Sequence, residues 1–155
     1  MITKEKKVEK ICSFYASDYH LEMIMIPYIN KKIENNSKII IMTQKDLKET
    51  AETVISKINL PEDRKKEILS IDWESNDPEK IKEIKNTNNA QEIVIFVIGN
   101  LNYIKNINNS IYEYIKNYNA KVVDCYSLED SQEKMIEIVS EHTKVLNTAQ
   151  EKDLS

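Results

Sequence analysis

Ile93-Val94-Ile95-Phe96-Val97-Ile98, followed by Gly99 and Asn100, is the most apolar run in this 155-residue chain. A short apolar run bounded by turn-forming residues is typical of a strand that is buried on both faces of a parallel sheet. Segments with apolar residues at helical spacing lie on either side of it. The run therefore predicts an α/β fold in which residues 92–98 form a central strand.

Strand-like and helix-like segments alternate along the rest of the chain. Strands are predicted at 9–16, 39–43, 68–73, 92–98 and 121–126, and residues 144–146 form either a sixth, edge strand or a helix extension. Helices are predicted after the caps Ser17-Asp18, Thr43/Asp46 and Asp77-Pro78, over 101–117, and after a capping box formed by Asp130 and Glu133. This alternation predicts a three-layer sandwich, with a mostly parallel five- or six-stranded sheet and helices on both faces, as in RecA-like and Rossmann-like folds.

The length favours a single α/β domain over residues 1–146, which includes an Asn-rich loop at 86–90. Residues 147–155 are polar, and we expect them to form a frayed tail. The polar N-terminus predicts no signal peptide, and no apolar stretch approaches the ~20 residues of a membrane span. Two cysteines, Cys12 and Cys125, indicate reduced thiols, so we expect a cytoplasmic protein.

Gly99 is the only glycine, and this excludes the phosphate-binding loops that need several glycines. The net charge of −4 argues against a protein that binds nucleic acid directly, because phosphate contacts require clustered Lys and Arg. We also expect no metal and no cofactor. Cys12, Cys125, His20 and His142 are the conceivable metal ligands, but they lack the spacing of a metal site.

Ligands of open α/β sheets bind beyond the carboxyl ends of the strands. The residues predicted to lie there and to form a ligand site are Tyr15, Asp18, His20, Thr43, Trp73, Gly99, Asn100 and Tyr126. This edge mixes hydroxyls, carboxylates and aromatic rings with few cations. It therefore suits a neutral or cationic small molecule, or a protein partner, better than a polyphosphate.

Each candidate also has a structural interpretation. Asp18 is placed to cap a helix, Trp73 to pack in the core, and Gly99 to form a turn. His142 lies on a helix face beside apolar residues, where a packed or surface histidine is expected. Asp72 and Glu74 would share one face of a strand, where paired carboxylates serve either acid–base chemistry or solvation.

Three stretches near the N-terminus resemble the opening of the MEDS domains, the methanogen/methylotroph sensory domains of the dichloromethane-regulator type. They are Cys12-Ser13-Phe14-Tyr15, Ser17-Asp18 and Ile26-Pro27-Tyr28-Ile29. The C-terminal part of the chain resembles the closing part of those domains, with the matching residues in the same order. They are Ile111-Tyr112-Glu113, Asp124-Cys125-Tyr126, Ser131, Glu133, His142 and Val145-Leu146. Lys10 stands where the family often has a histidine. The resemblance implies a RecA/KaiC-like fold without a working phosphate loop, used to sense small organic molecules.

Three functions follow as hypotheses. The first is a stand-alone sensory or regulatory domain that binds a small organic ligand and controls transcription or signalling through a partner, such as a kinase or a sigma-factor regulator. The second is a degenerate RecA-like protein-interaction module without a ligand, and a homodimer is left open. The third is an enzyme that uses Asp18, His20, Asp72 or Glu74 as acid–base groups.

Overall fold

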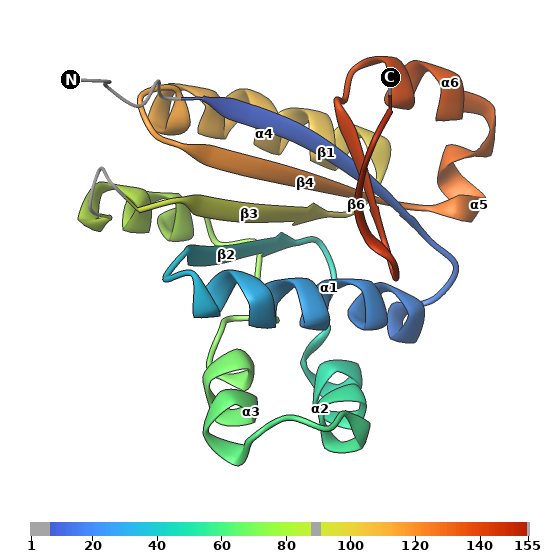
Figure 1. Cartoon of the computed structure of the whole chain (residues 1–155). Helices are drawn as coiled ribbons and strands as arrows, with labels where there is room; N and C mark the ends of the chain where they lie inside the picture. The colour runs from blue at the N-terminus through green and yellow to red at the C-terminus, as the bar shows by residue number, and fades with distance from the viewer. Residues whose placement is uncertain (1–6, 88–90, 155) are drawn as a thin grey trace.

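Six strands form one sheet in the order β2-β3-β4-β1-β5-β6 in the computed structural model, which describes residues 7–87 and 91–154 (Figure 1). The strands are β1 (Val8–Tyr15), β2 (Lys38–Thr43), β3 (Ile93–Ile98), β4 (Ala120–Ser127), β5 (Lys144–Asn147) and β6 (Gln150–Asp153). All neighbouring pairs are parallel except β5 and β6. The predicted α/β sandwich with a mostly parallel sheet is therefore confirmed.

Helices cover both faces of the sheet. One face is covered by α1 (Asp18–Glu34), against which α2 (Lys48–Lys57) and α3 (Glu62–Leu69) pack (Figure 1). The other face is covered by the 3-10 helix η1 (Pro78–Asn86), α4 (Leu101–Ile115) and α6 (Met135–Ser140). The short elements α5 (Leu128–Ser131) and η2 (Gln132–Lys134) lead into α6. None of the helices among the described residues is long and apolar enough to cross a membrane.

The β3 strand joins two separate cores. Its alternate residues Val94, Phe96 and Ile98 pack on the α1 side, while Ile93, Ile95 and Val97 pack on the α4 side. All six side chains are buried, because β3 lies between β2 and β4 and has helices on both faces. The unbroken apolar run thus arises from a strand that must fill both faces, as predicted.

The strand predicted at 68–73 is wrong. Ile68 and Leu69 end α3, and the chain then loops to Trp73, whose indole N–H donates to the Ile68 carbonyl oxygen at 3.0 Å. These residues are apolar because the loop packs into the core beside α1. A short apolar run does not distinguish a buried loop of this kind from a buried strand. The edge of β2 is instead satisfied by Lys80, whose ammonium donates to the Ile41 carbonyl oxygen at 2.6 Å.

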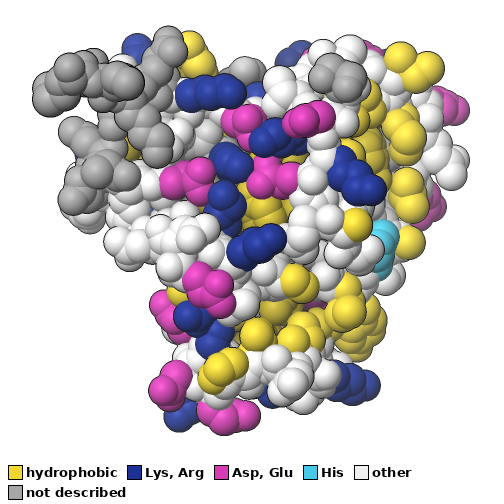
Figure 2. Space-filling model, viewed as in Figure 1, with side chains coloured by type: hydrophobic (Ala, Val, Ile, Leu, Met, Phe, Trp, Pro, Cys, Tyr) yellow, Lys and Arg dark blue, Asp and Glu magenta, His cyan; other side chains and the backbone are white. Residues whose placement is uncertain are grey.

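The tail predicted to fray also has a defined structure. Gln150–Asp153 form β6 and pair with β5, so β5 is an inner strand rather than an edge. Four side chains tie β6 to the sheet in a closed ring of alternating charge, Glu9, Lys121, Glu151 and Lys144, with nitrogen–oxygen distances of 3.1–3.7 Å. Figure 2 shows lysines and acidic side chains interleaved over the middle of this face. Polarity alone did not reveal this, because the ring needs partners on four different strands.

Two smaller predictions also change. Ser127 caps α5 by accepting the Asp130 amide at 3.1 Å, so the expected capping box of Asp130 and Glu133 is wrong. The Asn-rich loop expected over 86–90 falls partly outside the described residues. Its first residue, Asn86, ends η1.

Candidate functional site

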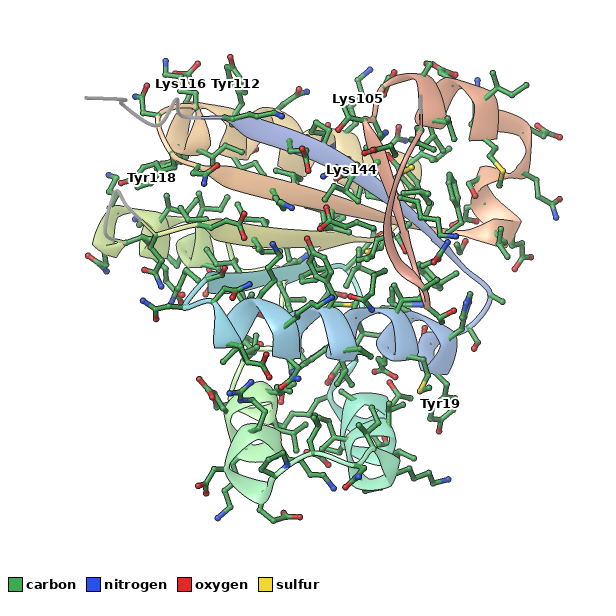
Figure 3. The ribbon with its side chains drawn as sticks, viewed as in Figure 1. Tyr19, Lys105, Tyr112, Lys116, Tyr118 and Lys144 are labelled. Atoms are coloured by element: carbon green, nitrogen blue, oxygen red, sulfur yellow. The ribbon has the colours of Figure 1, made fainter. Side chains whose placement is uncertain are left out.

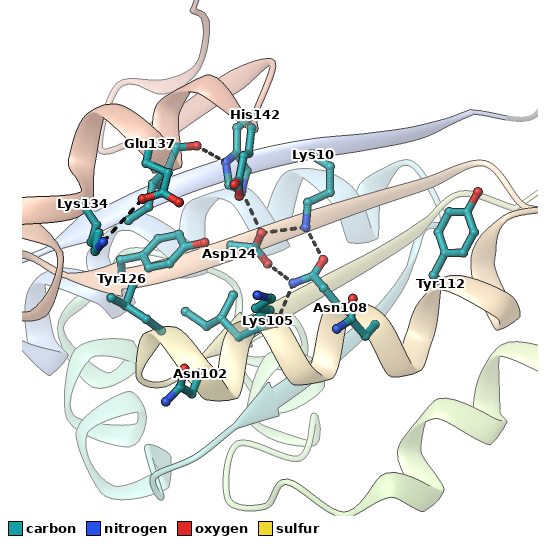
Figure 4. Close-up of a pocket in the computed structure, with 15 residues that line it drawn as sticks. Lys10, Asn102, Lys105, Asn108, Tyr112, Asp124, Tyr126, Lys134, Glu137 and His142 are labelled. Atoms are coloured by element: carbon teal, nitrogen blue, oxygen red, sulfur yellow. Dashed lines mark hydrogen bonds and ion pairs between the residues drawn. The ribbon is translucent and has the colours of Figure 1, made fainter.

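A groove of about 690 Å³ runs between α4 and α6 over the middle of the sheet (Figure 4). Its floor is formed by Lys10 of β1 with Asp124 and Tyr126 of β4. Leu101, Asn102, Ile104, Lys105, Asn108, Asn109 and Tyr112 of α4 form one wall, and Lys134, Glu137, Ile138, Glu141 and His142 form the other. Its volume lies within the usual range of small-molecule sites.

Chain connectivity accounts for the groove. The α4 helix connects β3 to its neighbour β4, whereas the α5–α6 segment connects β4 to β5 and must pass beyond β1. Both connections lie on the same face. They therefore diverge over β4 and β1, and neither helix fills the space between them.

Asp124 is the centre of the floor, and its side chain is only 2% exposed. One carboxylate oxygen accepts from the Asn108 amide at 2.8 Å. The other accepts from the Lys10 ammonium at 2.7 Å and meets the His142 Nε2 at 2.8 Å. Lys10 also donates to the Asn108 side-chain oxygen. Every polar group of this buried cluster thus has a partner, as low-dielectric surroundings require.

His142 joins α6 to this floor. Its other ring nitrogen, Nδ1, lies 2.5 Å from the Ile138 carbonyl oxygen, and its side chain is only 1% exposed. Both ring nitrogens therefore lie within hydrogen-bond distance of oxygen atoms. With both nitrogens occupied, His142 holds α6 against β4 and offers no vacant nitrogen to a reacting group.

Strand register brings the two charged floor residues together. Lys10 aligns with Val122 and Cys12 aligns with Asp124, so Lys10 and Asp124 occupy the same face of neighbouring parallel strands. Burial raises the pKa of the nearby Cys12 thiol to about 11, and the charge of Asp124 acts in the same direction. Cys12 is therefore an unreactive thiol at neutral pH.

Tyr126 is the one predicted site residue that lines the groove. Its ring stacks on Phe14 with a centroid separation of 5.9 Å, and it meets His142 edge-on at 6.2 Å. Burial raises the pKa of the Tyr126 hydroxyl, and the charge of Asp124 raises it further. The hydroxyl therefore stays protonated and can serve as a hydrogen-bond donor within the groove.

Tyr15 and Asp18 come together elsewhere, around Lys45. The Lys45 ammonium lies 2.5 Å from an Asp18 carboxylate oxygen and 5.2 Å from the centre of the Tyr15 ring. His20 belongs to the same helix start, and its Nδ1 accepts the Ala16 amide at 2.8 Å. Ser17, rather than Asp18, caps α1 by accepting the His20 amide. Each of these side chains has a partner within the protein, and none of them lines the groove.

The remaining predicted site residues have structural roles. Thr43 is buried and donates to the Lys45 carbonyl oxygen, and Trp73 is wholly buried. Asn100 caps α4 by accepting the Tyr103 amide at 2.8 Å. Gly99 is required by close approach, because a Cβ there would lie 2.5 Å from Tyr103 Cδ2 and 2.7 Å from Gln44 Oε1.

The residues of the acid–base hypothesis do not converge. Asp72 and Glu74 lie in the loop before η1 and pair with Lys80 and Lys48, at 3.4 and 3.8 Å. Neither they nor Asp18 and His20 line the groove.

The conceivable metal ligands do not converge either. Cys12 packs in the core on the α4 side of the sheet, and Cys125 packs in the core on the α1 side. Among residues 7–87 and 91–154, no group of three or more His, Cys, Asp and Glu side chains is arranged to hold a metal.

The predicted ligand site included Tyr126 but missed the two charged residues of the groove floor, Lys10 and Asp124. A usable signal was present in β4, because Asp124 lies among the apolar residues Val122, Val123 and Cys125, and a charge in such a stretch needs a buried partner. No family model, curated protein or solved structure matches the chain, so the resemblance to the MEDS domains stays a prediction.

Proposed function

We propose that this protein is a sensory domain that binds a small organic molecule in the groove between α4 and α6. The observation that carries the proposal is the groove itself, a cavity of about 690 Å³ over a floor held rigid by the Asp124 cluster. A preformed cavity with a few fixed polar groups is the usual form of a small-molecule site. The site extends further over the sheet than the strand-end edge expected from sequence.

The proposal includes a protein partner that binds differently to the ligand-bound and ligand-free forms of the domain. The α6 helix supports this step, because it forms one groove wall and also carries Ile136, which is 89% exposed. This side chain offers a partner an apolar contact on the same helix that forms the groove wall. A ligand that shifts or stiffens α6 would change how this side chain is presented. In this proposal the protein acts in the cytoplasm, and the output is control of transcription or of a signalling pathway.

Ligand binding is tested by thermal unfolding of the whole chain against a broad panel of cellular metabolites. A true ligand at 100 times its Kd stabilises the folded state by ~2.7 kcal/mol. Asn109→Trp, which fills the groove from α4, should abolish the stabilisation, whereas Asn106→Trp on the same helix is the matched control because Asn106 does not line the groove. If every stabilising metabolite acts equally on both variants, the groove is not the site and the proposal fails.

Partner binding is tested separately with Ile136→Ser. This substitution should weaken capture of the partner and leave ligand affinity unchanged. Tyr19→Ser, at another exposed apolar position, on α1, is the control (Figure 3). If Tyr19→Ser abolishes partner capture, and neither the ligand nor Ile136→Ser changes it, the protein is an interaction module and the sensory proposal is wrong.

A further inference from the structure

The groove is divided along its length by polarity. At its end near the carboxyl ends of the strands, Leu101, Ile104, Tyr126 and Ile138 form an apolar base, and the exposed side chains Asn102, Lys134 and Glu137 form a polar rim above it. Its middle and far end present Lys10, Lys105, Asn108 and Tyr112 (Figures 3 and 4). Ile104 and Asn108 are one helical turn apart on α4, so the change from apolar to polar takes place over a single turn. A molecule that lies deep in the groove therefore contacts an apolar base at one end and polar side chains at the other.

The charged side chains around the groove are not all paired within the protein. Both oxygens of Asp124 are engaged, and Glu137 pairs with Lys134 at 3.7 Å. Lys10 makes two of the three hydrogen bonds that an ammonium can donate, and its side chain is 31% exposed. Lys105 forms no ion pair within the described part of the chain. Two positive groups are therefore available on the floor and the α4 wall.

One acidic residue limits the ligand's charge. Glu141 lies on the opposite wall, is exposed, and forms no ion pair with the described residues. Its carboxylate would repel a second negative charge on a bound molecule. The apolar end would also have to desolvate such a charge without a partner.

We infer that the ligand is a monocarboxylate with an apolar tail, its carboxylate held by Lys10 and Lys105 and its tail lying against Tyr126 and Ile104. This inference rests on the proposed function and names the chemical class of the molecule that is sensed. Hydrogen bonds from ammonium groups to a carboxylate are short and strong, which gives the preference for an acid over a neutral molecule. The tail is recognised by the apolar area that it removes from water.

Four eight-carbon probes test the inference: octanoate, octanamide, octylamine and suberate. Titration of the whole chain, followed by amide chemical shifts in two-dimensional NMR, should show octanoate bound roughly tenfold or more tightly than octanamide, since a charged hydrogen bond contributes about 1.5–3 kcal/mol. Octylamine and suberate should bind more weakly than octanoate. The shifts should map to α4, β4 and α6.

Lys105→Gln removes a positive charge from the groove without disturbing the fold, because Lys105 is exposed and makes no ion pair with a described residue. It should weaken octanoate binding roughly tenfold and leave octanamide binding unchanged, and Lys116→Gln, outside the groove at the C-cap of the same helix, should change neither. If octanamide binds as tightly as octanoate and both are lost in Asn109→Trp, the carboxylate inference is overturned and the groove stands. If the metabolite panel yields no groove-dependent ligand and octanoate shifts no groove residue, the proposed function itself fails.

Discussion

The Nε2 atom of His142 lies 2.8 Å from a carboxylate oxygen of Asp124, and both side chains are almost fully buried. This contact joins the segment after α6 to the middle of β4, two elements that are otherwise separated by the groove. Lys10 reaches the same carboxylate oxygen from β1. The shape of the groove therefore depends on one carboxylate that holds the floor and a wall together.

Asp124→Ala should destabilise the protein strongly. It leaves the buried His142 Nε2 without its acceptor and removes the carboxylate that pairs with the partly exposed Lys10, and removal of one member of a buried charged group typically costs about 3–5 kcal/mol. Urea unfolding followed by circular dichroism measures the loss. Glu137→Ala, which removes a carboxylate exposed on the groove rim, is the control and should change stability by less than about 1 kcal/mol. Equal losses in the two variants would show that the cluster contributes nothing specific.

Lys80→Met tests the edge of β2. The Lys80 ammonium donates to carbonyl oxygens of Ile41, Ser75 and Asp72, and methionine keeps its bulk but donates nothing. Burial lowers the pKa of Lys80, but the charge of Asp72 opposes this and supports the charged form. We expect a loss of about 2–4 kcal/mol, because buried acceptors left without donors cost about 1–3 kcal/mol each.

Hydrogen exchange and urea unfolding both report on this variant. Amide exchange in the loop between α3 and η1 should accelerate more than exchange in β4. Lys82→Met, at an exposed position in the same 3-10 helix, should stay within about 0.5 kcal/mol of the unmodified protein. A Lys80 variant as stable as the Lys82 variant would show that β2 needs no such donor.

The contrast between β3 and the 68–73 segment explains which parts of the fold were predictable. Both segments are apolar, but β3 has six consecutive buried residues flanked by turn formers, whereas Ile68 and Leu69 belong to the end of a helix. A run of apolar residues indicates that a segment is buried, but it does not tell whether the buried segment is a loop or a strand. Local signals therefore predicted β3 and failed where a loop and the Lys80 side chain complete the sheet edge.

The site was less predictable than the fold for a related reason. Strand-end positions such as Asp18 and Asn100 are recognisable from sequence, but here Asp18 pairs with Lys45 and Asn100 caps α4. The groove arises from the divergence of α4 and α6, which depends on strand order, and strand order is not encoded in any local pattern. Of the eight predicted site residues, all within the described part of the chain, Tyr126 alone lines the groove.

Glu151→Gln should loosen β6. Glu151 meets Lys121 at 3.1 Å and Lys144 at 3.6 Å, and both lysines also pair with Glu9. Burial alone would raise the pKa of Glu9, but its ion pairs with Lys144 and Lys121 outweigh burial and lower it. Removing one charge from this partly buried ring should cost about 1–2 kcal/mol, more than an isolated surface pair.

The expected result is faster amide exchange at Lys152, which pairs with Val145 across the two strands, with little change in β3. Asp153→Asn, at the exposed end of β6, is the matched control. If exchange at Lys152 is the same in both variants, the strand pairing alone holds the tail.

Glu22→Gln should remove a pH dependence of stability. Glu22 lies on α1 and is fully buried, one of its oxygens accepts from the Thr50 hydroxyl of α2 at 2.6 Å, and the other has no partner among the described residues. Burial raises the pKa of Glu22 to about 7, Asp18 adds to the rise, and the Thr50 hydrogen bond opposes it. The folded state therefore keeps a proton that the unfolded chain releases near pH 4.5. The contribution of Glu22 to the free energy of unfolding is therefore complete below about pH 4.5, and it is lost as the pH rises to about 7.

Glutamine stays neutral and still accepts from Thr50, so the variant should match the unmodified protein at pH 4.5 and exceed it by about 2–3 kcal/mol at pH 8. Urea unfolding at several pH values measures the difference, and Glu52→Gln on the exposed face of α2 corrects for the general effect of charge removal. The difference between the two variants should grow through the window and then level off above pH 7. A constant difference across the whole range would mean that Glu22 is ionised in the folded protein at every pH tested, and its burial between α1 and α2 would then have to be stabilised by a group other than the proton.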